Sequence, residues 1–252
     1  MHGFDCGLGL RAATDVRLVR RHDEHVASRM QRAAAFRDSW EKLEFRHAAR
    51  RIRLPLQHNR RIQRAIPVEK HGQLAGFLDR DGPLNAPVVR EGKPYPPSSV
   101  TEFQLLPGVA EGCRALHAAG YVLVVATNQP DVGRGTQTQA SVEAMHALLL
   151  KFIPEIAHIE VCYEPGNTNP PSEFRKPAPG MLHRAAKALH LDLAQSWMIG
   201  DRWRDVNCGA NAGCRTIFLD WGYAEKLQTP PDFTVRCFTE AAGIILAQTP
   251  RA

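Results

Sequence analysis

From residue 74 onward, short apolar runs alternate with segments of helical pattern, and this alternation most restricts the possible fold. It predicts an α/β domain with three layers, in which helices cover both faces of a mainly parallel central sheet. We expect strands at 74–78, 121–126, 159–162, 197–199 and 216–219. We expect helices at 107–119, 138–152, 180–190, 205–212 and 239–247. In such sheets, ligands bind beyond the carboxyl ends of the strands.

The charge of the chain is unevenly distributed. Residues 1–70 carry 16 Lys and Arg against 8 Asp and Glu, a net of +8, whereas residues 71–252 carry 16 against 18, a net of −2. We therefore divide the chain into a basic, Arg-rich N-terminal extension (1–70), poorly ordered or loosely helical, and a folded domain (71–252). Whether the extension binds acidic surfaces or is an upstream stretch outside the fold stays open.

Composition favours a soluble cytoplasmic protein. An apolar content of 44% is sufficient for a core, but no apolar run reaches the ~18 residues that a membrane span requires. No secretory signal is recognisable at the N-terminus. The six cysteines are scattered without a Cys-x-x-Cys pair, which favours reduced thiols over disulfides.

Two carboxylates, Asp79 and Asp81, directly follow the first expected strand and precede the breakers Gly82 and Pro83. Two acids at a strand end can hold a hard divalent cation, or can serve as a nucleophile and a general acid. In isolation the pattern more often marks a surface turn, so its weight depends on the segments that follow.

Three further segments come after expected strands. Thr127 and Asn128 end the second strand and could hydrogen-bond phosphate oxygens, and Arg134 lies between two glycines in the next loop. Arg175 and Lys176 precede the expected helix at 180–190, where they could neutralise a phosphoryl group. Asp201 follows the fourth strand, and Asp205 stands four residues later as a second metal ligand or as a helix cap.

The order of these segments resembles the haloacid dehalogenase superfamily of phosphatases. The matching segments are Phe77–Gly82, Thr127-Asn128, Lys176-Pro177 and Gly200-Asp201 with Asp205. Within that superfamily, the sequence is most similar to the small, capless heptose-bisphosphate and histidinol-phosphate phosphatases. The resemblance covers roughly residues 72–246 and does not include the basic extension.

The resemblance implies a two-step phosphoryl transfer. Asp79 would attack phosphorus, and Asp81 would protonate the leaving alcohol and then activate water. Mg²⁺ would be held by the Asp79 carboxylate, the Asp81 backbone carbonyl and Asp201, with support from Asp205. The phosphate and the rest of the substrate would be bound by Thr127, Asn128, Arg134, Arg175 and Lys176.

Two positions depart from the family pattern. Pro83 stands where these enzymes usually have Thr, so we expect an altered loop and a reduced rate without loss of the chemistry. The stretch Cys162–Phe174 offers one Cys and no His, where relatives often carry a Cys₃His zinc site. Four N or S ligands are normal for structural zinc, so we expect none here.

The expected activity is hydrolysis of a phosphomonoester, most simply a sugar bisphosphate such as D-glycero-D-manno-heptose 1,7-bisphosphate at its 7-phosphate. That activity would place the chain in carbohydrate metabolism and in the synthesis of lipopolysaccharide precursors. Histidinol phosphate and a nucleic-acid 3′-phosphate are alternatives of the same chemistry, and a non-catalytic scaffold is an alternative of another class. We expect a cytoplasmic monomer whose partner is a small phosphorylated substrate, with no membrane and no nucleic acid.

Overall fold

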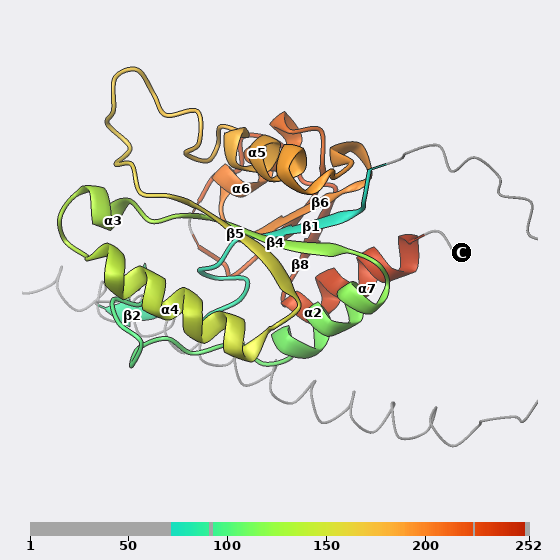
Figure 1. Cartoon of the computed structure of the whole chain (residues 1–252), viewed down its shortest axis with the longest axis horizontal. Coiled ribbons are helices and arrows are strands. Elements are labelled where there is room, and N and C mark those ends of the chain that lie inside the picture. The colour runs from blue at the N-terminus through green and yellow to red at the C-terminus, as the bar shows by residue number, and fades with distance from the viewer. Residues whose placement is uncertain (1–71, 91–92, 224, 250–252) are drawn as a thin grey trace, which may run out of the picture.

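A computed structural model describes residues 72–90, 93–223 and 225–249. At its centre stands a six-stranded parallel sheet in the order β5-β4-β1-β6-β7-β8 (Figure 1). The strands of this sheet are β1 (Ala75–Leu78), β4 (Val122–Asn128), β5 (Ile156–Cys162), β6 (Trp197–Gly200), β7 (Arg215–Leu219) and β8 (Phe233–Val235). A separate antiparallel hairpin, β2 (Val88–Arg90) and β3 (Lys93–Tyr95), follows β1 in the chain.

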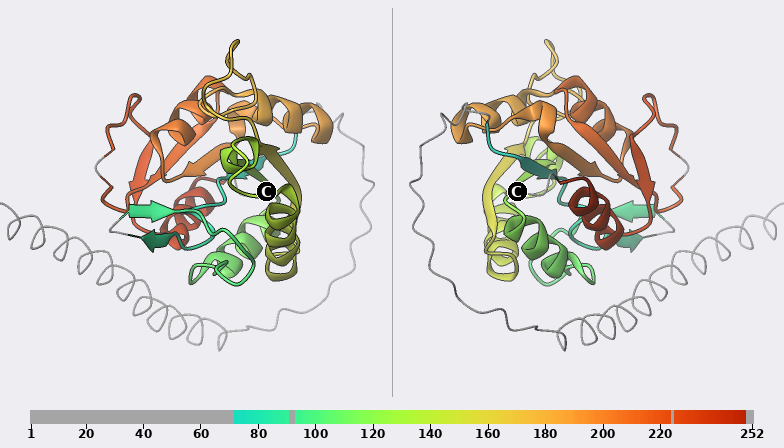
Figure 2. Two further views of the ribbon diagram at one scale, coloured as in Figure 1. Left: turned by 90° about the vertical axis from the view of Figure 1, so that its left-hand side faces the viewer. Right: turned by 90° about the vertical axis from the view of Figure 1, so that its right-hand side faces the viewer.

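Helices cover both faces of the sheet (Figures 1 and 2). One face carries α2 (Val109–Ala118), α4 (Gln139–Phe152) and α7 (Phe238–Gln248), and the other carries α5 (Gly180–Leu189) and α6 (Trp203–Asn211). A one-turn helix α3 (Pro130–Gly133) and a 3-10 turn η1 (Leu193–Gln195) complete the described elements. The result is the predicted three-layer α/β fold.

The side chains of the central strands alternate between two apolar cores, as the twofold period of a strand requires. In β1, Leu78 packs into the core under α2, α4 and α7, whereas Phe77 packs into the core under α5 and α6. In β4, Leu123 and Val125 face the first core and Val124 faces the second. Both faces of these strands are therefore buried, which explains their continuous apolar sequences.

The order of the strands brings the predicted site residues together. The chain builds β4 and β5 on one side of β1 and then returns to build β6, β7 and β8 on the other side. The direction of winding therefore reverses at β1, and the crevice at such a reversal is the usual ligand site of an open parallel sheet. Asp79 follows β1 and Asp201 follows the neighbouring strand β6.

The sequence-based elements differ from the structure in several places. The hairpin β2–β3, the strand β8, the short helix α3 and the 3-10 turn η1 were not predicted, and β5 begins at Ile156 and not at residue 159. β5 is an edge strand in which Ala157 and His158 are exposed, so its first half lacks the apolar run of a doubly covered strand. None of the described helices is long and apolar enough to cross a membrane. The predicted extension, 1–70, lies outside the described residues.

Candidate active site

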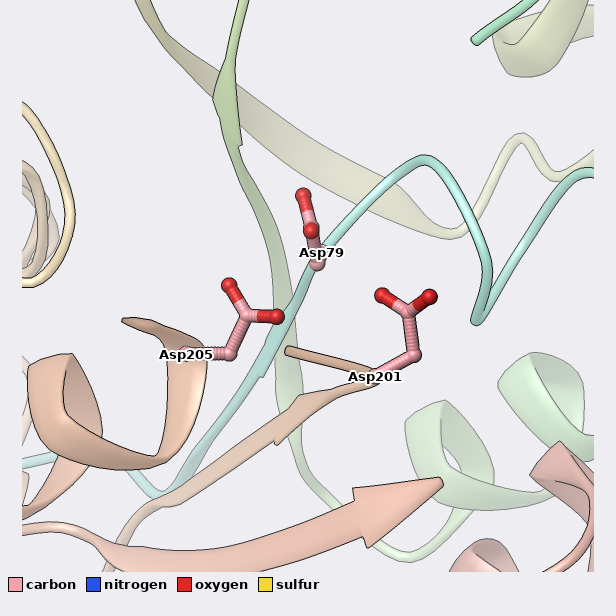
Figure 3. A group of neighbouring side chains, drawn as sticks. All are labelled: Asp79, Asp201 and Asp205. Atoms are coloured by element: carbon pink, nitrogen blue, oxygen red, sulfur yellow. The ribbon is translucent and has the colours of Figure 1, made fainter. Parts of the chain in front are cut away.

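Three buried carboxylates meet where β1 and β6 end (Figure 3). Asp79 follows β1, Asp201 follows β6, and Asp205 lies in the first turn of α6. Each offers an oxygen within 4.8 Å of the others, and they form the single potential metal-ligand group found in the described part of the chain. The acids predicted from positions far apart in sequence are thus neighbours in space.

Two glycines make this approach possible. A Cβ on Gly82 would lie 2.3 Å from the Asp201 carboxyl group, and a Cβ on Gly200 would lie 2.1 Å from the Asp205 Cβ. Gly82 also has φ of +103°, a conformation that side chains other than glycine's rarely adopt. The glycine of the Asp-x-Asp-Gly segment is therefore required by the acid cluster itself.

Lys176 supplies the positive charge closest to the acids. Its Nζ lies 2.8 Å from Asp79 Oδ1 and 2.6 Å from Asp205 Oδ1, and its side chain is 2% exposed. Burial works against this ammonium charge, but the charges of Asp205 and Asp79 outweigh burial and raise the pKa of Lys176. Asp205 also accepts a hydrogen bond from the backbone N–H of Arg202, and this contact caps the N-terminus of α6.

The cluster holds more negative charge than Lys176 can balance. Burial raises the pKa of Asp79 to about 7, with Asp205 adding to the effect and Lys176 opposing it. Burial, followed by Asp205 and Asp79, raises the pKa of Asp201 well above its usual range. The buried Asp201 Oδ1 has no hydrogen-bond partner. An uncompensated carboxylate oxygen among acids fits a hard divalent cation, which prefers oxygen ligands.

Asp81 does not join this group. Its side chain points to a different set of donors, formed by Arg80, Asn85 and Gln129. The side chains of Asp81 and Asp79 nevertheless line the same pocket of about 330 Å³. The two acids of the motif therefore occupy different environments, as separate roles in catalysis would require.

The remaining predicted residues fall into two sets. Asn128 binds the backbone of Lys176, because its Nδ2 donates to Lys176 O at 3.1 Å and its Oδ1 accepts from Lys176 N at 3.1 Å. Thr127 is buried and accepts a hydrogen bond from Gln129 Nε2 at 2.9 Å. These contacts make Asn128 a support for Lys176. Asn128 also lines the pocket, so its predicted contact with substrate stays a prediction.

Four arginines line the pocket. Arg134 and Arg175 were predicted as site residues, whereas Arg202 and Arg204 were not. Burial lowers the pKa of Arg175, and the charges of Arg204 and Arg134 lower it further, so the three cations lie near one another. Arg134 pairs with Asp131 at 3.0 Å, and Arg175 donates to the Glu164 carbonyl at 2.9 Å.

Pro83 is accommodated by the turn that follows Asp81. The backbone N–H groups of Leu84 and Asn85 both donate to Arg80 O at 3.1 Å, and Gly82 N donates to Asn85 O at 3.0 Å. These hydrogen bonds use the residues on either side of Pro83. The absence of an N–H at Pro83 therefore leaves each of these bonds intact.

The fold and the family match first define a class of protein. A HAD-hydrolase-like family model matches residues 173–241, the segment that carries Lys176 and the Asp201–Asp205 turn. The structure resembles that of a D,D-heptose 1,7-bisphosphate phosphatase from B. bronchiseptica complexed with magnesium and phosphate. In that match the TM-score is 0.60 and the identity 26%, over 69% of this chain and 99% of the other. A putative HAD-like phosphatase from Mesorhizobium loti matches with a TM-score of 0.57 and 30% identity, over 73% of this chain and 88% of the other.

Sequence relatives then define the family. A D-glycero-beta-D-manno-heptose-1,7-bisphosphate 7-phosphatase of Pseudomonas putida is 31% identical over 67% of this chain and 95% of its own length. The enzyme of the same name from Salmonella typhi is 35% identical over 57% of this chain and 78% of its own length. The chain belongs to the haloacid dehalogenase superfamily and, within it, to the family of these phosphatases. It is a phosphatase, which confirms the resemblance read from the sequence.

Proposed function

We propose that this phosphatase is a Mg²⁺-dependent phosphomonoesterase that removes the 7-phosphate of D-glycero-D-manno-heptose 1,7-bisphosphate through an aspartyl-phosphate on Asp79. The observation that carries the proposal is the position of Asp79, which contacts the Lys176 ammonium group and belongs to the group of acids that can hold a cation. A carboxylate attacks an anionic phosphate only where positive charge offsets their repulsion.

The proposed metal ligands are the carboxylates of Asp79 and Asp201 and the backbone carbonyl of Asp81, with Asp205 in support. When bound, Mg²⁺ would offset the repulsion between nucleophile and phosphate and would favour the ionised form of the acids. Lys176 would bind a phosphoryl oxygen, and Asn128 would keep Lys176 in place through its two backbone contacts. Thr127 is the proposed hydroxyl ligand at the end of β4.

The proposed phosphoryl transfer has two steps, first to Asp79 and then to water. An oxygen of Asp79 attacks phosphorus, and as the bond to the sugar oxygen breaks, that oxygen takes the proton of Asp81. Water then attacks the phosphorus of the aspartyl-phosphate and gives its proton to Asp81. The second step releases inorganic phosphate and restores the Asp79 carboxylate and the protonated Asp81.

The positive charge of the arginines that line the pocket favours a substrate with a second anionic group. Arg134, Arg175 and Arg204 would bind the second phosphate of a bisphosphate, whereas they would repel the ammonium group of histidinol phosphate. A nucleic-acid 3′-phosphate remains an alternative that depends on the basic extension. A non-catalytic scaffold is disfavoured, since the chain carries every group that the chemistry requires.

The setting we propose is the cytoplasm, with a monomeric enzyme that acts on a small sugar phosphate in lipopolysaccharide precursor synthesis. Five described cysteines, at positions 113, 162, 208, 214 and 237, are free thiols, which suits a reducing compartment.

The test is phosphate release from a panel of substrates, with and without Mg²⁺. The panel contains the heptose bisphosphate, the matching monophosphate, histidinol phosphate and a 3′-phosphorylated oligonucleotide. We expect the bisphosphate to give the highest kcat/KM and every activity to require Mg²⁺. A preference for histidinol phosphate or the oligonucleotide would reject the proposed substrate, and activity without a divalent cation would reject the proposed mechanism.

A further inference from the structure

Arg80, the residue between the two acids of the motif, has no role in the chemistry described so far. It is fully buried and is the largest such side chain in the described part of the protein. Its Nη2 lies 3.0 and 2.9 Å from the two carboxylate oxygens of Asp81, and its Nε lies 3.1 Å from Asp81 Oδ1. A planar guanidinium group in this position fixes both the location and the rotation of the carboxyl group.

His146 holds Arg80 from the opposite side. It lies on α4, and its Nε2 is 3.2 Å from Arg80 Nη1. Because an arginine can only donate, His146 must accept through Nε2, which requires a neutral ring with its proton on Nδ1. Burial, and then the charge of Arg80, lower the pKa of His146 to about 4 against the opposing effect of Asp81. The ring is therefore a neutral acceptor at physiological pH.

Two amides complete the surroundings of Asp81. Asn85 Nδ2 donates to Asp81 Oδ1 at 3.0 Å, and Gln129 Nε2 donates to Asp81 Oδ2 at 2.7 Å. Both carboxylate oxygens are thus held by side chains from the turn after β1 and from the end of β4, while α4 holds the arginine. Asp81 nevertheless retains an exposed edge, since 21% of its side chain is accessible at the pocket.

We propose that Arg80, held by His146, is a positioning residue that orients the Asp81 carboxyl group toward the leaving oxygen of the substrate. The inference rests on the proposed function, in which Asp81 supplies the proton that the departing sugar oxygen takes with its bonding electrons. If Arg80 acts through Asp81, its loss will slow the release of leaving groups that need this proton and will spare the release of those that do not. Asp81 also takes the proton of water in the second step, which all substrates share. The comparison is therefore made on kcat/KM, which reports the steps up to release of the leaving group.

The experiment compares two leaving groups in the full-length enzyme with Mg²⁺. A sugar phosphate has a poor, alkoxide leaving group that needs a proton, whereas para-nitrophenyl phosphate has a good leaving group that does not. For Arg80→Lys, which keeps the charge but loses the planar fork, we expect kcat/KM for the sugar phosphate to fall at least about tenfold. We expect kcat/KM for para-nitrophenyl phosphate to change by less than about threefold.

His146 provides a second, independent pair of variants. His146→Ala removes the acceptor and should show the same selective loss, while His146→Gln restores an acceptor oxygen and should recover most of the lost kcat/KM. The matched control is His158→Ala on the edge strand β5, whose side chain is 43% exposed, and it should leave both substrates unaffected. If Arg80→Lys fails to fold, the two His146 variants carry the test alone.

Asp81→Asn separates this inference from the proposed function. If kcat/KM for the sugar phosphate falls selectively in Asp81→Asn but not in the Arg80 and His146 variants, the positioning role is wrong and the proposed function stands. Equal losses of kcat/KM for both substrates in Arg80→Lys, or a His146→Gln enzyme with kcat/KM as low as that of His146→Ala, would likewise overturn the inference. If Asp81→Asn lowers kcat/KM equally for both substrates, the proton-donor role proposed for Asp81 is wrong, and the positioning role that depends on it is wrong as well.

Discussion

Single residues decide how closely the acids of this site can approach each other. Gly82 and Gly200 are the clearest cases, because a methyl group at either would overlap a neighbouring aspartate. In each acid motif the carboxylates supply the chemistry, and a glycine supplies the space in which two carboxylates can meet.

Gly82→Ala tests this requirement. The added Cβ would lie 2.3 Å from the Asp201 carboxyl group, so Asp201 must move away from Asp79. We expect kcat/KM to fall on the order of a hundredfold and the Mg²⁺ concentration for half-maximal rate to rise, as steady-state kinetics will show. Gly120→Ala is the matched control, since Gly120 has φ of +90° with nothing within 4 Å of its Cβ position. Equal kinetic losses in both variants would indicate backbone strain alone.

The buried histidine gives a prediction for pH. The pKa of His146 is about 4 in the folded protein against 6.5 in the unfolded chain, so the unfolded state binds a proton first as the pH falls. This contribution to stability is complete above pH 6.5 and is lost as the pH falls toward 4. It amounts to up to about 3 kcal/mol. Urea unfolding across this range should show a shallower pH dependence for His146→Gln than for the wild type, and identical dependences would contradict the prediction.

At the scale of elements, the carboxyl ends of β1, β4 and β6 and the segments that follow them supply most of the site, and the loop between β5 and α5 supplies Arg175 and Lys176. Polar contacts hold that loop: Ser172 Oγ donates to Glu164 Oε1 at 2.8 Å, and Arg175 Nη1 donates to Glu164 O at 2.9 Å. The buried Cys162 has Ser172 as a neighbour, with 4.0 Å between Sγ and Oγ.

The loop leads to a prediction about zinc. A structural zinc site would need three more N or S ligands near Cys162, and the loop itself contains none. We expect purified protein to contain no stoichiometric zinc, and a zinc-selective chelator to leave its melting temperature unchanged. A structural zinc would stabilise such a site by on the order of 10 kcal/mol, so its removal would lower the melting temperature. Elemental analysis that finds about one zinc per chain would contradict the prediction.

The sequence predicted the central elements well because their signals are local. Continuous apolar runs marked β1, β4 and β6, and residue types at strand ends indicated Asp79 and Asp201 before the structure brought them together. The sequence did not assign roles to Arg80, His146 and Gln129, because their contacts join residues far apart in the chain. Gln129 and Asp81 are 48 residues apart, and Arg80 and His146 are 66 residues apart. The one local signal was the position of Arg80 between two acids. A helical histidine such as His146 carries no signal of its own.

At the scale of the whole molecule, the charge divides between the two parts of the chain. The net charge is +8 for residues 1–70 and −2 for residues 71–252, and every residue assigned here to the site lies in the second part. In that part, backbone hydrogen bonds join Gln73 to His190 and Asp192, just after the C-terminus of α5.

Removal of residues 1–68 tests this division. We expect the shortened protein to remain folded and soluble, with kcat and KM for the sugar bisphosphate within about twofold of the full chain. Its isoelectric point should fall well below the 9.2 of the whole sequence. Circular dichroism, thermal unfolding and steady-state kinetics provide the comparison. An insoluble or inactive product would show that the basic segment packs on the core.

The most direct test of the account is to trap the phosphorylated enzyme. Wild-type protein mixed with the sugar bisphosphate and Mg²⁺, and quenched in acid during turnover, should carry one phosphoryl group on the peptide that contains Asp79. Peptide mass spectrometry measures it, and Asp79→Asn should show neither this group nor phosphate release. Wild-type turnover without phosphorylation of Asp79, or near-normal activity in Asp79→Asn, would contradict the account.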